Sequence, residues 1–242
     1  MKALQALIFD VDGTLADTER DGHRPAFNAA FADAGLDWYW DEALYGELLA
    51  VTGGKERMRF FCERYAPDFL KRPDADERIK ALHAAKTAHY VRIVESGALP
   101  LRPGVARLIA EARQAGIRLA IATTTSPENV EVLLRASLAP DAMQWFEVIG
   151  AGDAAAKKKK PAPDVYLWVL ERLGLPASAC LALEDSENGI RSSRAAGIPT
   201  LITESEYTRG QDFSGALAVL PDLAATTLAE IRNIFDKSLS SA

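Results

Sequence analysis

Five short apolar runs, each followed by small or polar residues, constrain the fold of this chain more than any other feature. They are ALIF at 6–9, IRLAIATT at 117–124, FEVIG at 146–150, CLALE at 180–184 and PTLIT at 199–203. Most of these runs are continuously apolar rather than alternating, which is typical of strands buried on both faces. They therefore predict the central strands of a sheet that is covered on both sides.

Helical patterns between the later runs indicate how these strands are connected. The segments 104–116, 126–138 and 163–174 place their apolar residues on one helical face, and 188–197 is a short helix that ends at Gly197. Ser126 is expected to cap the second of these helices. This alternation of strands and helices predicts an α/β fold, a Rossmann-like parallel sheet with helices on both faces.

Residues 18–99 have a different pattern, because they contain no convincing buried strand and several helical periodicities. We therefore expect two domains. The α/β core would comprise 1–17 and 100–242, and a small helical cap domain would be inserted at 18–99.

Composition narrows the possible partners. The 28 basic and 34 acidic residues give a net charge of −6, which argues against sequence-independent binding of nucleic acid. The two cysteines, Cys62 and Cys180, match no metal-ligand spacing and are expected to be reduced thiols of a cytoplasmic protein. No signal peptide or membrane span is predicted, and we expect a monomer that acts on a small molecule.

Polar residues follow the predicted strands, at the edge where ligands bind in open parallel sheets. Asp10 and Asp12 follow the first strand, hydroxyl residues 123–126 follow the second, and Lys160 lies some distance after the third. The fourth strand ends in Glu184 and is followed by Asp185. Four converging carboxylates would repel one another and shift their pKa values unless a cation were present. Because oxygen ligands suit a hard ion, Mg²⁺ is the expected cofactor.

Each of these features also has a structural explanation when it is taken alone. Asp10 and Asp12 could start a turn at Gly13, and Ser126 could serve only as a helix cap. The lysines at 157–160 could form a solvated face, and EDSENG could be a loop. These explanations become poor for the full set, because every feature falls at a strand end and in this order.

The motifs DVDGT, a threonine after the second strand, KP and EDS resemble those of the haloacid dehalogenase superfamily over the whole chain. The resemblance implies that Asp10 is a nucleophile that forms an aspartyl-phosphate. Asp12 would protonate the leaving alkoxide and then activate water. Thr123 would hydrogen-bond the transferred phosphoryl group, and Lys160, which directly precedes Pro161, would neutralise its charge.

The resemblance also implies a metal site and a cap. Mg²⁺ would be held by the Asp10 side chain, the Asp12 backbone carbonyl and Asp185, with Glu184 supporting the set. The inserted segment is similar to the helical cap of the subgroup that contains β-phosphoglucomutase and phosphoglycolate phosphatase.

Longer motifs, among them TGGKER and ATTTS.ENV, resemble the CbbY family. That family accompanies carbon-fixation genes and converts xylulose 1,5-bisphosphate, an inhibitor of Rubisco, to xylulose 5-phosphate. Glu19 would then bind sugar hydroxyls, and Gly53, Gly54 and Lys55 would hold the distal phosphate. The remaining expected substrate contacts are His23, His83, Lys86, Thr124, Thr125, Ser126 and Asn129. The segment TGGKER could also be an ordinary interhelical turn, and residues 60–79 do not align with the family.

Several rival functions share these motifs. A sugar phosphomutase of the β-phosphoglucomutase type and a phosphoglycolate phosphatase would use the same core residues. A dehalogenase is disfavoured because Asp12 has no role in that chemistry. A receiver-like signalling domain with a phosphorylated aspartate is the non-enzymatic alternative, but such domains have about half this length and lack a cap.

Overall fold

The structure, a computed structural model, describes residues 4–240, and this part of the chain divides into two compact units. One unit comprises the described residues up to Asp17 together with those from Pro100 onwards. The other unit comprises Thr18–Leu99.

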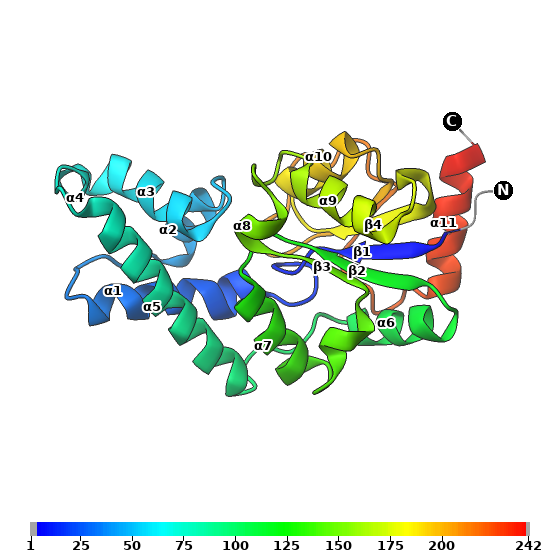
Figure 1. The fold of residues 1–242 in the computed structure, drawn as a ribbon, viewed down its shortest axis with the longest axis horizontal. Coiled ribbons are helices and arrows are strands. Elements are labelled where there is room, and N and C mark those ends of the chain that lie inside the picture. The colour runs from blue at the N-terminus through cyan, green and yellow to red at the C-terminus, as the bar shows by residue number, and fades with distance from the viewer. Residues whose placement is uncertain (1–3, 241–242) are drawn as a thin grey trace. The chain divides into compact units, whose positions relative to one another are not determined.

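Parallel strands form the sheet of the first unit (Figure 1). Within the described residues they are β1 Ala6–Phe9, β2 Arg118–Ala122, β3 Val148–Gly150, β4 Cys180–Glu184, β5 Thr200–Thr203 and β6 Ala218–Leu220. Their order in space is β3-β2-β1-β4-β5-β6, and all neighbours pair in parallel. Every residue of β1 and β4 is buried, as their apolar runs predicted, and this includes the charged Glu184 at the end of β4. The strand order reverses between β1 and β4, which is the place where doubly wound sheets bind ligands.

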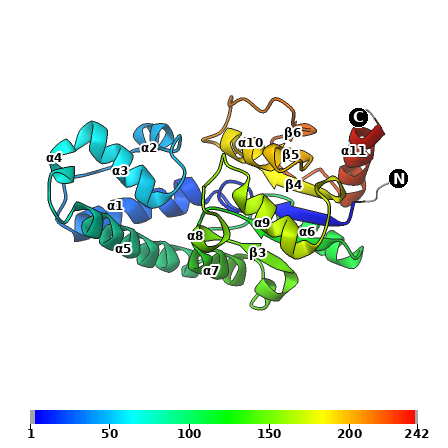
Figure 2. The same cartoon turned by 45° about the horizontal axis from the view of Figure 1, so that its top comes forward.

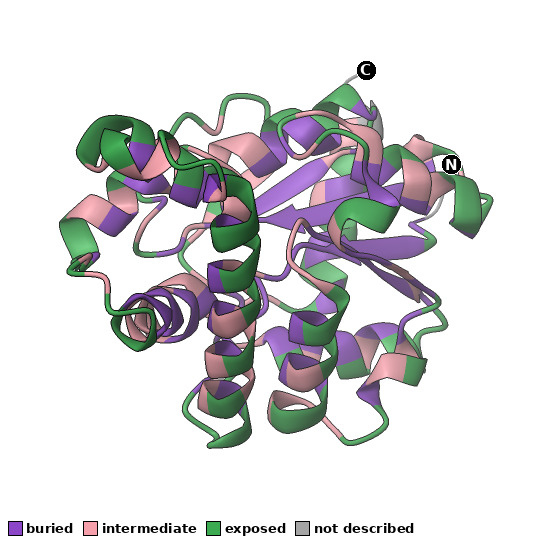
Figure 3. Cartoon of the chain, turned by 60° about the vertical axis from the view of Figure 1, so that its left-hand side comes forward, coloured by how far each residue is buried: buried purple, intermediate pink, exposed green. Residues whose placement is uncertain are grey.

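Helices cover both faces of this sheet, so the predicted α/β fold is confirmed (Figures 1 and 2). Helices α9 (Asp164–Leu173) and α10 (Glu187–Ala195) lie on one face, and α6 (Val105–Gln114) and α7 (Pro127–Ser137) lie on the other. The remaining elements are α8 Gly152–Ala155, α11 Leu228–Ser240, and the 3-10 turns η2 Ala142–Trp145 and η3 Ala177–Ala179. Figure 3 shows that burial concentrates on the strands and on the helix faces that pack against them.

The two chain connections that flank residues 18–99 meet on the first unit. Ala16 forms an antiparallel bridge with Leu101, and the Arg102 amide donates to the Leu15 carbonyl at 2.8 Å. The buried Arg102 guanidinium pairs with Asp17 at 3.4 Å and donates to the carbonyl of Gly13. The first unit therefore closes on itself at the point where the chain leaves and returns.

The second unit is helical throughout. It contains the π-helical turn η1 Glu19–His23, α1 Arg24–Asp33, α2 Glu42–Leu48, α3 Gly54–Tyr65, α4 Pro67–Leu70 and α5 Ala75–Glu95. Its interior is aromatic, since the ring of Trp40 packs against those of Phe27, Phe31 and Phe61 at centroid distances of 4.7, 4.9 and 5.4 Å. These contacts bury a large apolar area within a short segment, which supplies the unit with its own core.

Two further sequence features can be located. Within residues 4–240 no helix combines the length and the apolar character that a membrane span requires. Cys62 in α3 and Cys180 in β4 are both buried and both carry free thiols.

Candidate active site

Three carboxylates converge at the carboxyl ends of β1 and β4. Asp10 directly follows β1, Glu184 is the last residue of β4, and Asp185 comes next. The parallel register, in which Phe9 pairs with Leu183, brings the two strand ends together. All three side chains are buried, and each offers an oxygen within 4.8 Å of the others.

The Lys160 side chain lies inside this group and donates hydrogen bonds to two of its carboxylates and to a backbone carbonyl. Its ammonium group donates to Asp10 Oδ1 at 2.5 Å, to Glu184 Oε1 at 2.7 Å and to the Ala122 carbonyl at 2.9 Å. An ammonium group has three protons, so each of them has a partner. Only 6 % of Lys160 is exposed, whereas Lys157 and Lys158 of the same run are exposed.

The electrostatics of the group favour a bound cation. Burial raises the pKa of Asp10 from 3.8 to about 8 against the attraction of Lys160, and the charges of Glu184 and Asp12 act in the same direction as burial. Burial, and then repulsion from Asp10 and Glu184, raises the pKa of Asp185 well above its usual range. Burial alone would lower the pKa of Lys160, but the two carboxylates that it contacts outweigh this effect and raise it. The site therefore contains more acidic groups than its one lysine can neutralise.

The donor set fits a hard divalent ion. It consists of carboxylate oxygens, which Mg²⁺ prefers, and Glu184 Oε2 is buried without a hydrogen-bond partner among the described residues. Three carboxylates and one ammonium group leave two negative charges, which one such ion would neutralise. Asp12 is half-buried and its side chain is not one of the three that converge, so its expected contribution through the backbone stays a prediction.

Two glycines make room for the carboxylates. Gly13 has a φ of 87°, and a Cβ there would overlap the Asp185 carboxylate. A Cβ at Gly189, in the first turn of α10, would overlap the carboxylate of Glu184. At both positions any larger residue would displace the neighbouring carboxylate. The sequence pattern indicated only Gly13, as a turn glycine.

The hydroxyl segment after β2 forms a compact turn. Thr123 is buried, its amide donates to the Gly150 carbonyl at 2.9 Å, and its Oγ1 accepts from the Thr125 amide at 3.3 Å. Thr124 is half-buried. Ser126 caps α7 by accepting from the Asn129 amide, and Asn129 Nδ2 donates to Thr125 Oγ1 at 2.9 Å.

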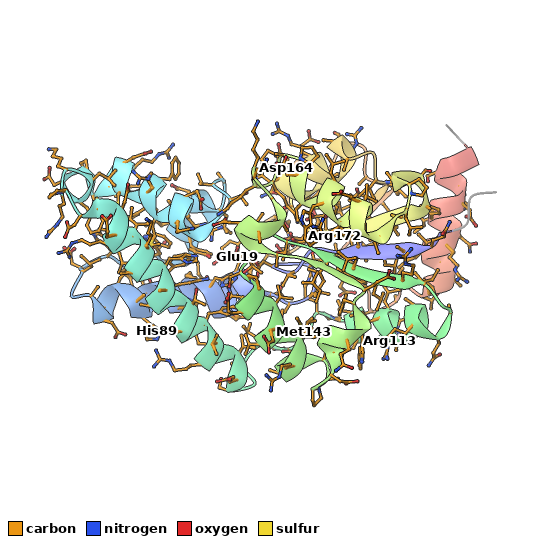
Figure 4. The ribbon with its side chains drawn as sticks, in the orientation of Figure 1. Glu19, His89, Arg113, Met143, Asp164 and Arg172 are labelled. Atoms are coloured by element: carbon orange, nitrogen blue, oxygen red, sulfur yellow. The ribbon has the colours of Figure 1, made fainter. Side chains whose placement is uncertain are left out.

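In the helical unit, the structure places Glu19 in a polar network that the sequence did not predict. Tyr45 donates to the Glu19 carboxylate, and the buried Arg57 donates to Tyr45 at 2.8 Å and pairs with Glu19 at 3.4 Å. Figure 4 labels Glu19 among the side chains of η1. Arg57 and Tyr45 were missed because an arginine and a tyrosine on amphipathic helices carry no distinctive pattern.

Two of the other expected contacts of the helical unit, Lys86 and Gly54, lie beside the Phe27 ring. Lys86 is buried, with its ammonium group 2.8 Å from His23 Nδ1 and 5.1 Å from the Phe27 ring centre. A Cβ at Gly54 would contact both His83 and Phe27. Gly53 and Lys55 are half-buried on either side of Gly54, and Lys55 lines a cavity of about 470 Å³ together with residues of α3 and α5.

Two residues of the sheet unit also escaped the sequence analysis. Tyr166 donates its hydroxyl to Glu184 Oε1 at 2.5 Å, although its spacing had placed it on an apolar helix face. Arg102 donates to carbonyls of Gly13, Thr203 and Glu204 and so joins the loops after β1 and β5. The sequence offered one indication that this arginine is buried, namely its apolar neighbours Leu101 and Pro103.

Comparison with known proteins agrees with this geometry. The family model of the haloacid dehalogenase-like hydrolases matches residues 4–197. Protein CbbY of Cupriavidus necator, encoded on a plasmid, is 58 % identical over 221 residues, which cover 91 % of this chain and 86 % of that protein.

Solved structures show the same likeness. CbbY from Rhodobacter sphaeroides in complex with phosphate superimposes with a TM-score of 0.85 at 46 % identity, covering 94 % of this chain and 98 % of that one. A β-phosphoglucomutase from Clostridium difficile superimposes with a TM-score of 0.79 at 19 % identity over 98 % of this chain and 99 % of that one, which shows a shared fold alone. The chain therefore belongs to the haloacid dehalogenase-like hydrolases, and within them it is a phosphatase of the CbbY type.

Proposed function

We propose that this protein is a Mg²⁺-dependent sugar-bisphosphate phosphatase that converts xylulose 1,5-bisphosphate to xylulose 5-phosphate and so removes an inhibitor of Rubisco. The convergence of Asp10, Glu184 and Asp185 around Lys160 carries the proposal of phosphoryl transfer. The substrate is suggested by CbbY from Rhodobacter sphaeroides, a mutant of which was solved in complex with xylulose 1,5-bisphosphate.

In the proposed reaction Asp10 attacks phosphorus and Asp12 gives a proton to the departing sugar oxygen. The aspartyl-phosphate is then hydrolysed by water, from which Asp12 takes the proton back. Lys160 donates to Asp10 Oδ1 at 2.5 Å, which fixes the orientation of the attacking carboxylate. Thr123, buried at the end of β2, would hydrogen-bond the transferred phosphoryl group.

Asp10, the Asp12 carbonyl and Asp185 would hold Mg²⁺, with Glu184 in support. When it is bound, the ion supplies positive charge that lets two anions approach each other and stabilises the charge of the transition state. Asp10 needs this positive charge nearby, because burial raises its pKa to about 8 and a protonated carboxyl group is a poor nucleophile.

The helical unit would select the substrate. Gly53, Gly54 and Lys55 would bind the distal phosphate with help from His83 and Lys86, and Glu19 and His23 would contact the sugar. The buried Lys86 ammonium, beside His23 and the Phe27 ring, supports this assignment as a cation held in one place. Thr124, Thr125, Ser126 and Asn129 would line the substrate from the sheet unit.

The test is phosphate release with Mg²⁺ from xylulose 1,5-bisphosphate, ribulose 1,5-bisphosphate, β-glucose 1-phosphate and phosphoglycolate. Strong preference for the first supports the proposal, and better turnover of phosphoglycolate would indicate that phosphatase instead. Conversion of β-glucose 1-phosphate to the 6-phosphate without net release would indicate a mutase. A persistent aspartyl-phosphate would indicate a signalling domain. Activity of Asp10→Asn equal to wild type would refute the catalytic assignment.

We also propose that the protein works as a cytoplasmic monomer on this small substrate, without nucleic-acid or membrane partners. Light scattering after size-exclusion chromatography tests the oligomeric state. A mass near the 26.2 kDa of the chain is expected, and a stable dimer would contradict it.

A further inference from the structure

Tyr166 is a fully buried hydroxyl residue for which the proposed reaction has no role. Its ring lies in the core cluster between the sheet and α9, among Ile8, Ala122 and Val169. The apolar neighbours account for the ring but not for the hydroxyl, because burying a polar group is costly unless it forms a hydrogen bond. The hydroxyl donates to Glu184 Oε1 at 2.5 Å.

The two oxygens of Glu184 have different surroundings. Oε1 accepts from both Tyr166 and Lys160, at 2.5 and 2.7 Å. Oε2 is buried, lies against Gly189, and has no hydrogen-bond partner among residues 4–240. Two donors on one oxygen therefore fix the plane of the carboxylate and leave the second oxygen uncommitted.

A phenol suits this task because it donates without adding charge. A tyrosine hydroxyl is neutral near neutral pH and donates one proton, which here goes to Glu184 Oε1. A second ammonium or a guanidinium would halve the net negative charge that a divalent ion has to neutralise. The Tyr166 ring centre also lies 5.2 Å from Lys160 Nζ, so the ring and hydroxyl border both ends of the Lys160–Glu184 pair.

We propose that Tyr166 is a positioning residue of the phosphatase reaction, whose hydroxyl orients Glu184 so that Oε1 serves Lys160 while Oε2 supports the cation. This inference rests on the proposed function, since it assumes that the carboxylate group binds Mg²⁺. Tyr166, on the apolar face of α9, would then help to align Lys160 through Glu184, and Asp10 through Lys160.

Tyr166→Phe tests this, because phenylalanine keeps the ring and removes only the hydroxyl. Tyr65→Phe is the matched control, a half-exposed tyrosine of α3 whose hydroxyl lies 3.5 Å from Glu47. The measurements are kcat and KM at saturating Mg²⁺, the Mg²⁺ dissociation constant by calorimetry without substrate, and the melting temperature in EDTA.

A hydrogen bond to a charged group predicts a fall in kcat of about 10-fold and weaker Mg²⁺ binding of about 5-fold, with KM changed less than about 2-fold. In a Glu184→Gln background the same substitution should change kcat less than about 2-fold, because Tyr166 acts through Glu184. Tyr65→Phe should match wild type.

Two results would overturn the inference. One is a Tyr166→Phe enzyme with unchanged kcat and Mg²⁺ affinity, whether or not its melting temperature falls, since the hydroxyl would then serve stability alone. The other is an equal loss of kcat with and without Glu184→Gln. Both are distinguishable from failure of the proposed function, in which Asp10→Asn would retain wild-type activity.

Discussion

Replacing Lys160 by methionine should destabilise the protein in a way that depends on pH. The side chain is buried and pairs with both Asp10 and Glu184, and removing one partner from a buried ion pair costs about 3–5 kcal/mol. The carboxylates can escape this cost by taking up protons, which requires about 1.4 kcal/mol for each pH unit above their ordinary pKa. Because the folded variant then holds more protons than the unfolded chain, its stability falls as the pH rises.

We therefore expect the free energy of unfolding to fall by about 3–5 kcal/mol at pH 8, but by only about 2–3 kcal/mol at pH 6, where protonation of a carboxylate costs less. Urea denaturation in EDTA at both pH values measures this difference. Lys159→Met is the matched control, because Lys159 is half-buried and pairs with the exposed Asp153 at 3.4 Å, a kind of pair that contributes about 0–1 kcal/mol. Phosphate release should fall at least about 10²-fold in Lys160→Met. An equal stability loss at both pH values, or a Lys160→Met protein as stable as the control, would refute the reasoning.

Three further results are expected. Gly13→Ala should lower the free energy of unfolding by more than about 2 kcal/mol and abolish Mg²⁺ binding, because its Cβ would overlap the Asp185 carboxylate. The control is Gly35→Ala, at a φ of 65° with nothing within 4 Å, which should lower it by only about 1 kcal/mol and leave binding intact. Urea denaturation and calorimetry measure the two effects. Burial raises the pKa of Cys62 and Cys180 to about 11, so at pH 8 iodoacetamide should modify them about 10²-fold more slowly than an ordinary thiol, and rapid labelling of the native protein in mass spectra would disagree. Burial raises the pKa of Asp10 from 3.8 to about 8, so in EDTA the folded state binds more protons than the unfolded one across this range and stability falls as the pH rises through it. Mg²⁺ should therefore raise the melting temperature more at pH 8 than at pH 5.5, and a shift that does not depend on pH would contradict this.

The sheet was predictable because its central strands are apolar on both faces. The runs at 6–9 and 180–184 coincide with β1 and β4. Strand β6 was missed because it has only three residues, at the sheet edge, and its middle residue Val219 is 45 % exposed. A short edge strand is defined by its pairing with β5, which lies in the tertiary structure and not in a local pattern.

Some residues of the candidate site could be predicted from the sequence and others could not. Asp10, Glu184 and Asp185 could be predicted to converge, because acids at the ends of parallel strands share one edge of the sheet. Tyr166 could not, since the helical period assigns it to the core correctly and says nothing about its hydroxyl. Arg57 and Tyr45 meet Glu19 only through the packing of separate helices. Such partners depend on side-chain direction over long sequence distances.

The bridge between Ala16 and Leu101 has an evolutionary consequence. Where the two ends of an insertion are already adjacent, its length adds little to the entropy of closing the loop, which grows only slowly with the number of residues. Residues 18–99 could then be lengthened, replaced or recombined while the sheet and its acids stay as they are. Under the proposed division of roles, selection could thus change what the enzyme recognises in one segment of the gene and preserve how it reacts in the others.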